Sequence, residues 1–186
     1  MKRVVDFVLA LIASLIFLPL LVVLAVVVKL TSKGPVLYWS DRVGRDNRIF
    51  SMPKLRTMRT DTPVVATHLL SDPSRYLTPV GGFLRRTSLD ELPQLWCILT
   101  GDMSVVGPRP ALFNQQNLIE LRTEHGVHTI RPGLTGWAQI NGRDELPIPD
   151  KVRLDADYLR MQSLVFDAKV MVLTFIKVAR RDGISH

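Results

Sequence analysis

The sequence is poor in the residues that form covalent and metal cross-links. Cys97 is the only cysteine among 186 residues, which excludes an internal disulfide and a cluster of thiolates around zinc or iron. Such a chain suits a reducing compartment such as the cytoplasm. The four histidines show no His-Glu-x-x-His or comparable ligand spacing, so we expect them at structural or surface positions.

The common phosphate-binding loops are missing as well. The sequence contains neither G-x-x-x-x-G-K-[ST] nor G-x-G-x-x-G, so neither a P-loop nor a dinucleotide-binding fold is supported. Residues 133–136, Gly-Leu-Thr-Gly, resemble the GxxG loop of RNA-binding KH modules. However, the interior of this loop lacks basic residues, and no RNP-like aromatic strand accompanies it. We therefore expect no nucleic acid partner.

Charge is absent from residues 7–28, a run interrupted only by Ser14 and Pro19. As a straight helix at about 1.5 Å per residue, this run would reach about 33 Å, which is enough to cross a hydrocarbon core of about 30 Å. It is too long for the apolar part of a signal peptide, and no small-x-small cleavage site follows it. The run is therefore predicted to lie in a lipid membrane.

The path of this segment through the membrane depends on its proline and its flanks. Pro19 lies near the middle, where it removes a helical hydrogen bond and is expected to kink the helix. Because both ends are basic, the positive-inside rule gives a straight span no clear orientation. We predict a re-entrant helix that bends at Leu18-Pro19 and returns to the face it entered, with a simple span as the alternative. The flanking basic residues are Lys2, Arg3, Lys29 and Lys33.

The rest of the chain is predicted to be an α+β, mostly helical domain. Short strands at 36–39 and 48–52 flank a polar loop and predict a small β-hairpin. Apolar residues at helical spacing from Leu89 to Leu99 predict a helix that ends at Gly101. The remaining predicted segments are helices at 114–124 and 151–181 and a glycine-bearing loop at 131–136. The last helix combines a narrow basic stripe with a broad apolar surface, which favours a position in the membrane interface over an ordinary core helix.

Basic residues are concentrated between positions 42 and 59, where six of them face Asp46 alone; the whole chain carries a formal charge of +7. A positive field favours nucleic acid, anionic lipid or phosphorylated small molecules. Guanidinium groups bind phosphate through two hydrogen bonds, and the prolines on both sides of Arg109 would fix its backbone. The sequence therefore predicts a phosphate site, with candidate cations Lys54, Arg56, Arg85, Arg86, Arg109, Arg131 and Arg143.

An acidic pair, Asp90 and Glu91, follows Ser88 in a pattern that matches a helix capping box. Pro93 complicates that interpretation, because with Ser88 as the cap its missing N–H would leave the Leu89 carbonyl unpaired; a later helix start removes this cost. Neighbouring helical residues diverge by about 100°, so the two carboxylates would not share a proton. One of them could attack a substrate while the other holds a metal ion.

Four segments together resemble the bacterial sugar transferase family, the small monotopic phosphoglycosyl transferases of bacteria. They are residues 54–58, 84–95, 101–110 and 131–143, in the order and spacing of the family and across nearly the whole chain. The resemblance implies transfer of sugar 1-phosphate from a UDP-sugar to polyprenyl (undecaprenyl) phosphate, with release of UMP. This reaction is the first membrane step of bacterial polysaccharide or glycoconjugate synthesis.

The resemblance also implies roles for individual residues. Asp90 would be the nucleophile and would form an acyl-phosphate with the sugar phosphate, which the lipid phosphate then attacks. Glu91 would bind Mg²⁺. An anion that attacks an anionic diphosphate needs cations to offset repulsion, which agrees with the basic residues near the pair. The residues expected to bind substrate are Lys54, Arg56, Arg85, Arg109, Gln139, Arg143 and Asp167.

The implied organisation is a re-entrant membrane helix with its flanks at 1–33 and a cytoplasmic, membrane-associated catalytic domain at 34–186. The expected location is the bacterial inner membrane, with the active site on the cytoplasmic face. Relatives often carry Ser-Pro at the bend, whereas Leu18-Pro19 has no hydroxyl to bond a freed carbonyl. Homodimer formation stays open. Two other functions also remain open: a membrane-anchored scaffold, and a glycosyl transferase that moves the sugar without its phosphate.

Overall fold

One long helix is followed by a small domain of short helices and strands, as the predicted α+β, mostly helical class requires. The structure is a computed structural model that describes residues 1–63, 72–142 and 146–180. The elements are α1 (Lys2–Thr31), β1 (Leu37–Val43), η1 (Arg45–Asn47), β2 (Ile49–Leu55), η3 (Pro73–Tyr76), α2 (Gly81–Thr87), η4 (Leu89–Gln94), α3 (Leu95–Thr100), β3 (Ser104–Val106), α4 (Gln116–Glu124), η5 (Val127–Thr129), β4 (Gly133–Thr135), α5 (Trp137–Ile140), α6 (Ile148–Met161) and α7 (Leu164–Arg180).

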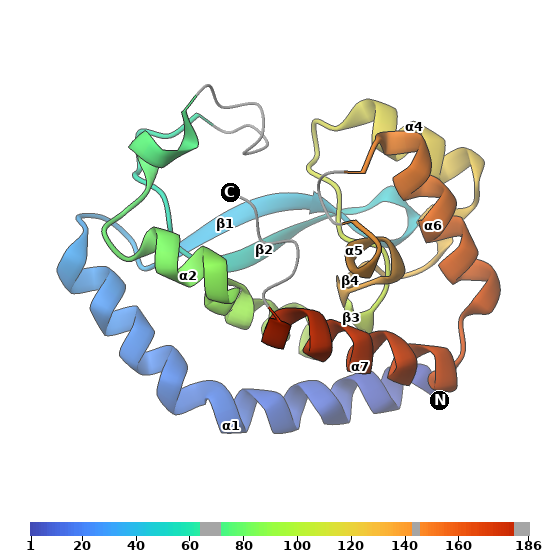
Figure 1. Ribbon diagram of the computed structural model, residues 1–186, viewed down its shortest axis with the longest axis horizontal. Helices are drawn as coiled ribbons and strands as arrows, with labels where there is room; N and C mark the ends of the chain where they lie inside the picture. The colour runs from blue at the N-terminus through green and yellow to red at the C-terminus, as the bar shows by residue number, and fades with distance from the viewer. Residues whose placement is uncertain (64–71, 143–145, 181–186) are drawn as a thin grey trace.

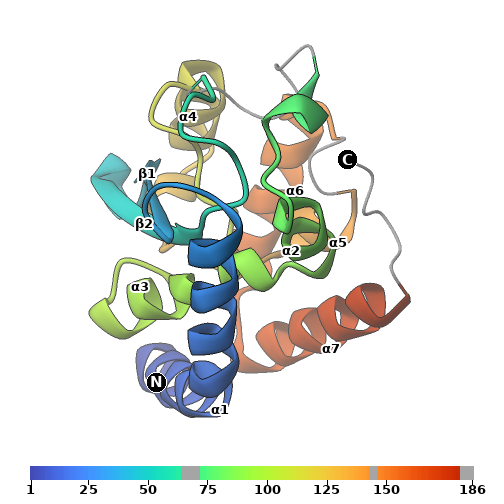
Figure 2. The same ribbon diagram turned by 90° about the vertical axis from the view of Figure 1, so that its left-hand side faces the viewer.

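Helix α1 lies along one side of the domain rather than projecting from it (Figures 1 and 2). Its most apolar 18-residue window has a mean hydropathy of 3.2, and only 11% of that window is buried. Ala10, Leu24 and Val28 enter the buried core, whereas Leu15 and Ile16 are each 66% exposed. A continuous apolar surface of this kind is unfavourable in water and suits contact with lipid. The predicted long apolar helix is thus confirmed.

The helix is continuous through Pro19, and its ribbon curves around the domain in Figure 1. A kink at Pro19 and a re-entrant path through a membrane stay predictions, as does the division of the chain at residue 33. Helix α7 lies on the same side of the molecule as α1 in both views (Figures 1 and 2). Its Val165 and Phe175 side chains are 82% and 75% exposed, so both helices carry exposed apolar side chains.

Both ends of α1 are tied to the domain by polar contacts. Near its start, the Lys2 ammonium donates to the Asp167 carboxylate on α7 over 2.6 Å. One turn later, Asp6 accepts a hydrogen bond from a hydroxyl on β3 over 2.8 Å. Just beyond its end, the Arg56 guanidinium donates to the Ser32 carbonyl and hydroxyl oxygens over 3.0 and 2.9 Å. The orientation of the helix relative to the domain is therefore fixed at both ends.

The predicted hairpin is present, with strands longer than expected. Strands β1 and β2 pair antiparallel from Leu37 opposite Leu55 to Val43 opposite Ile49. Met52 on β2 is 2% exposed, so one face of the hairpin packs into the core. The polar loop between the strands makes the turn because two of its residues adopt left-handed backbone conformations, which suit short polar side chains.

The prediction of a loop at 131–136 was wrong. Strand β4 pairs parallel with β3, with Ser104 opposite Gly133 and Val106 opposite Thr135. A Cβ atom at Gly133 would lie 2.1 Å from the Gly107 nitrogen, so this close approach of backbones requires glycine. The glycines that suggested a loop instead allow two strands to come together.

Two helix predictions also need correction. Ser88 is the N-cap residue of η4, but its φ is +55° and its side chain makes no capping bond. The apolar repeat from Leu89 to Leu99 therefore forms two pieces, the 3₁₀ helix η4 through Pro93 and then α3, which ends at Gly101 as predicted. Likewise, 151–181 is not one helix, because the chain breaks between α6 and α7 at Gln162.

Candidate active site

The acidic pair lies on η4, which packs against strand β2 of the hairpin. The left-handed conformation of Ser88 reverses the chain between α2 and η4. This turn brings Arg85 at the end of α2 close enough to influence the charge of both Asp90 and Glu91. Two short elements that follow one another in sequence thus supply an acid pair and a guanidinium group to one place.

Glu91 is held by two cations from distant parts of the chain. Its Oε1 atom accepts hydrogen bonds from Lys54 Nζ over 2.7 Å and from an Arg109 guanidinium nitrogen over 2.9 Å. Burial alone would raise the pKa of Glu91, but the Arg109 and Lys54 charges and their hydrogen bonds outweigh it and hold the pKa well below its usual range. Glu91 is therefore ionised throughout the physiological pH range.

Asp90 has the opposite environment. Its residue surface is 7% exposed, and no described residue donates a hydrogen bond to its carboxylate. Burial raises the pKa of Asp90 to about 6, although the nearby Lys54 charge opposes the shift. Adjacent carboxylates with opposite pKa shifts are suited to different tasks. Asp90 accepts no hydrogen bond from the described residues, while Glu91 binds two cations.

Burial also affects two of the cations beside the pair, Lys54 and Arg85. Burial lowers the pKa of Lys54 more than the neighbouring Glu91 charge raises it. Burial also lowers the pKa of Arg85, with Asp90 and Glu91 partly offsetting the effect. The Arg85 guanidinium is oriented by a 3.0 Å hydrogen bond from its Nε to the Thr57 hydroxyl. Partly desolvated cations gain from an incoming anion, so this cluster is suited to phosphate groups.

The structure does not bring every predicted substrate-binding residue to this cluster. Arg56 is 5% exposed, and its donors go to Ser32 and to the Pro35 carbonyl. Asp167 bonds Lys2 and the Tyr158 hydroxyl, the latter over 2.7 Å. These contacts give Arg56 and Asp167 structural positions at the two ends of α1.

Gln139 is held differently again, since its Nε2 donates to the Leu134 carbonyl over 3.3 Å, and its buried Oε1 has no partner among the described residues. Arg143 lies outside the described residues. Arg131 donates from Nε to the Gly101 carbonyl over 2.7 Å, which gives that cation a contact with backbone. The residues that the structure brings together at the acidic pair are thus Lys54, Arg85 and Arg109.

The pair has the ligands that a magnesium ion prefers. Within 1–63, 72–142 and 146–180, no three acidic, histidine or cysteine side chains gather into a metal cage. Mg²⁺, however, is commonly bound by one or two carboxylates together with substrate phosphates. Both hydrogen bonds that Glu91 accepts go to Oε1, which leaves Oε2 for another ligand. The residues present therefore fit a metal that arrives with a phosphorylated substrate.

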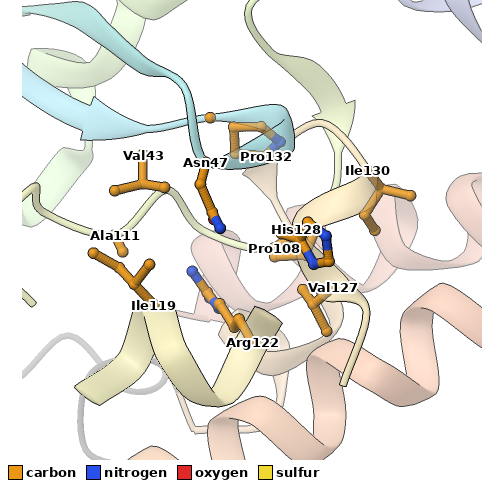
Figure 3. A pocket seen from close by; sticks show the side chains of 11 residues that line it. Val43, Asn47, Pro108, Ala111, Ile119, Arg122, Val127, His128, Ile130 and Pro132 are labelled. Atoms are coloured by element: carbon orange, nitrogen blue, oxygen red, sulfur yellow. The ribbon is translucent and has the colours of Figure 1, made fainter. Parts of the chain in front are cut away.

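A separate hollow lies behind the Pro-Arg-Pro segment, and no residue of the acidic pair lines it (Figure 3). Its polar lining comes from Asn47, Arg122 and His128. Arg122 was not among the residues predicted from the sequence. The signal that could have found it is weak, because a single arginine on a polar helix is indistinguishable from a surface residue until its partners are known.

Comparison with known proteins gives a consistent result. Residues 1–181 match the bacterial sugar transferase family. The chain is 42% identical to the UDP-glucose:undecaprenyl-phosphate glucose-1-phosphate transferase of Escherichia coli K12, with 95% of this chain and 40% of that protein covered. It is 36% identical to the UDP-N-acetylgalactosamine-undecaprenyl-phosphate N-acetylgalactosaminephosphotransferase of Aeromonas hydrophila, with 93% and 42% covered.

A third relative is closer in length. The chain is 41% identical to the uncharacterized sugar transferase EpsL of Bacillus subtilis, over 86% of this chain and 78% of that protein. By contrast, it spans only about 40% of the length of the Escherichia coli relative. The match nevertheless extends from the first residue of α1 to the end of α7, and so includes both the apolar helix and the acidic pair. The chain belongs to the bacterial sugar transferase family.

Proposed function

We propose that this chain transfers sugar 1-phosphate from a UDP-sugar to polyprenyl phosphate through an aspartyl-phosphate intermediate on Asp90. The observation that carries the proposal is the unequal acidic pair: Asp90 has no hydrogen-bond donor among the described residues, while Glu91 holds Lys54 and Arg109 beside it. The names of the Escherichia coli and Aeromonas hydrophila relatives, which both describe sugar phosphate transfer to undecaprenyl phosphate, support the same reaction class.

The reaction has two displacements at one phosphorus atom. In the first, an Asp90 carboxylate oxygen attacks the phosphorus that bears the sugar, and the bond from that phosphorus to the oxygen it shares with UMP breaks. UMP departs with the electron pair. In the second, an oxygen of polyprenyl phosphate attacks the same phosphorus, and its bond to Asp90 breaks. The products are polyprenyl-diphosphate sugar and the regenerated carboxylate, so one difficult displacement becomes two easier ones.

The cations make these steps feasible for reacting groups that are all anionic. Lys54 and Arg109 lie at hydrogen-bond distance from Glu91, and Arg85 acts on Asp90 by its charge. In this site they would offset the repulsion between carboxylate and diphosphate and stabilise charge on the departing UMP. Glu91 would hold Mg²⁺, which when bound neutralises phosphate charge. The structural positions of Arg56 and Asp167 favour indirect roles for these two residues.

The lipid substrate accounts for the apolar surface. Both ends of α1 contact the domain, through Lys2 and through Ser32. A straight span that left on the far side of a bilayer would separate one of these ends from its partner. The contacts therefore support a re-entrant helix held in one leaflet, with α7 in the interface. We place the active site on the cytoplasmic face of the bacterial inner membrane, where UDP-sugars are available.

Product analysis tests the reaction directly. Purified protein in detergent or nanodiscs, supplied with polyprenyl phosphate, Mg²⁺ and a panel of UDP-sugars, is expected to release UMP in proportion to lipid-linked product. Release of UDP would instead indicate a glycosyl transferase that moves the sugar alone. Absence of nucleotide release across the whole panel would favour a scaffold role, in which the acidic pair only stabilises the fold. The same panel identifies the donor sugar.

The rate is expected to depend on the ionisation of Asp90. Because its pKa is raised to about 6, the attacking carboxylate is lost as the pH falls through about 6, rather than near 3.8 as for an ordinary aspartate. The measurement is kcat/KM for the UDP-sugar between pH 5 and 8, with thermal unfolding at each pH as a control for integrity. Lys54→Met removes a charge that lowers this pKa, so its profile should move to higher pH. A flat profile down to pH 5 would contradict the assignment.

A further inference from the structure

The backbone of the segment that carries Arg109 is held through four successive carbonyl oxygens. Prolines at 108 and 110 have no N–H, so the backbone on either side of Arg109 cannot donate hydrogen bonds. Four consecutive carbonyls instead accept bonds from other parts of the chain. The donors to the carbonyls of residues 108, 109, 110 and 111 are Gly133 N (2.9 Å), Arg122 (2.8 Å), Arg42 (3.2 Å) and Val43 N (2.9 Å), respectively.

Arg122 is the buried charged donor of this set. It extends from α4 toward the backbone between Pro108 and Ala111 (Figure 3). Its residue surface is 8% exposed, and its NH1 group donates to the Arg109 carbonyl. The remaining face of its guanidinium donates from Nε and NH2 to Asp155 Oδ2 on α6, over 3.0 and 2.6 Å. Asp155 is 1% exposed, so its position is fixed by the core.

These contacts form one continuous path from α6 to the acidic pair. Asp155 orients Arg122, Arg122 binds the Arg109 carbonyl, and the Arg109 guanidinium binds Glu91 over 2.9 Å. Resting on the function proposed above, we infer that Arg122 and Asp155 are positioning residues that place Arg109 for phosphate binding. They act from behind the Pro-Arg-Pro segment and do not touch substrate.

A buried ion pair is a poor source of net stability, because desolvation of both charges offsets their attraction. It can, however, fix an orientation, because a guanidinium that donates to two acceptors in fixed directions has only one way to lie. Arg109 is partly exposed, with 33% of its side chain accessible, and it carries its charge at the end of a flexible stem. Fixing the backbone from which that stem starts restricts where the charge can lie. Misplacement of a catalytic group by about 1 Å can cost about a hundredfold in rate.

The test removes the ion pair without leaving a buried charge. The double variant Arg122→Leu/Asp155→Leu, the pair-less protein, keeps apolar side chains at both sites, and such replacements are often neutral for stability. It is compared with wild type, with Arg109→Ala, and with the triple variant. The matched control is Asp150→Asn/Arg153→Gln, which removes an exposed ion pair on the same helix, α6. For each protein, kcat and KM for the UDP-sugar and the melting temperature are measured.

If the pair acts through Arg109, its removal lowers kcat/KM by about tenfold to a hundredfold in wild type but by less than about threefold in the Arg109→Ala background. The control double variant stays at the wild-type rate. Melting temperatures test the inference without any need for catalysis. Arg109→Ala should lower the melting temperature of the pair-less protein by at most half as much as it lowers that of wild type, because Arg109 no longer forms its ion pair with Glu91 in the pair-less protein.

Additive effects on both quantities would overturn the inference, since a merely structural pair weakens the protein equally with or without the Arg109 side chain. Failure of wild type to release UMP would instead defeat the proposed function. In that case, non-additive changes in melting temperature would still establish that the Arg122–Asp155 pair positions Arg109, and additive changes would reject that role. The two conclusions can therefore fail separately.

Discussion

Asp90→Asn is expected to abolish UMP release while leaving the protein at least as stable as wild type. An amide oxygen is a poor nucleophile, and loss of a nucleophile typically lowers kcat by about 10³-fold or more. The expected effect on stability is unusual, because substitution of a buried residue normally lowers the free energy of unfolding. The folded pKa of about 6 lies above the ordinary 3.8, so at pH 7 the folded state disfavours the carboxylate by about 3 kcal/mol, a penalty that the neutral amide removes.

The measurement combines UMP release with thermal unfolding in the same detergent. Asp41→Asn, at an exposed position on strand β1, is the matched control and should retain both the wild-type rate and melting temperature. Incubation of wild type with a labelled UDP-sugar in the absence of lipid acceptor should also trap label on the protein, and Asp90→Asn should trap none. Near-normal turnover in the asparagine variant would rule out the covalent mechanism.

Glu91→Gln is expected to damage both activity and stability. The variant loses the carboxylate that we assign to Mg²⁺ and leaves Lys54 and Arg109 without their shared anion, so kcat/KM should fall by at least about a hundredfold. The lowered pKa of Glu91 shows that the fold favours its ionised form. That contribution to stability is present at neutral pH and is lost as the pH falls through the folded pKa. Loss of the anion from this partly buried cluster should cost about 3 kcal/mol.

A second substitution separates the two effects of Glu91→Gln. In Glu91→Gln/Lys54→Met, one unpaired cation is removed as well, so the melting temperature should recover part of its loss while activity stays low. The opposite signs of the stability changes at positions 90 and 91 are the most specific outcome, because a general disturbance of η4 would lower stability in both variants. Equal losses at the two positions would contradict the electrostatic description of the pair.

Local patterns predicted local structure. The charge-free run predicted α1, and two short strand-like segments on either side of a polar loop predicted the hairpin. Gly101 ended its helix as expected, since its φ of +102° suits glycine. Strand β4 was missed because a three-residue strand that pairs with β3 across nearly thirty positions leaves no periodic signal. The glycines there look like a loop until the neighbouring backbone is known.

The candidate site shows the same division between local and distant information. Asp90, Glu91 and Arg109 stand in recognisable motifs, and their place in the resemblance singled them out. Ser88 precedes η4 as the capping pattern suggested, but its backbone is left-handed and its side chain makes no capping bond, which the pattern did not predict. Arg56 was grouped with Lys54, two residues earlier, but β2 ends at Leu55, so the alternation of the strand no longer determines the direction of the Arg56 side chain. Only the three-dimensional structure shows that Arg56 reaches Ser32 instead.

The two fixed ends of α1 have a mechanical consequence. Arg56, which holds Ser32, is followed by Thr57, whose hydroxyl receives the Arg85 hydrogen bond beside the acidic pair. At the opposite end, Lys2 is fastened to α7. Because α1 is attached to the domain at both ends, the two would tilt and move as one body wherever α1 lies in a membrane. In the membrane arrangement proposed above, the depth of α1 in the leaflet would therefore also set the distance from Asp90 to the lipid headgroups.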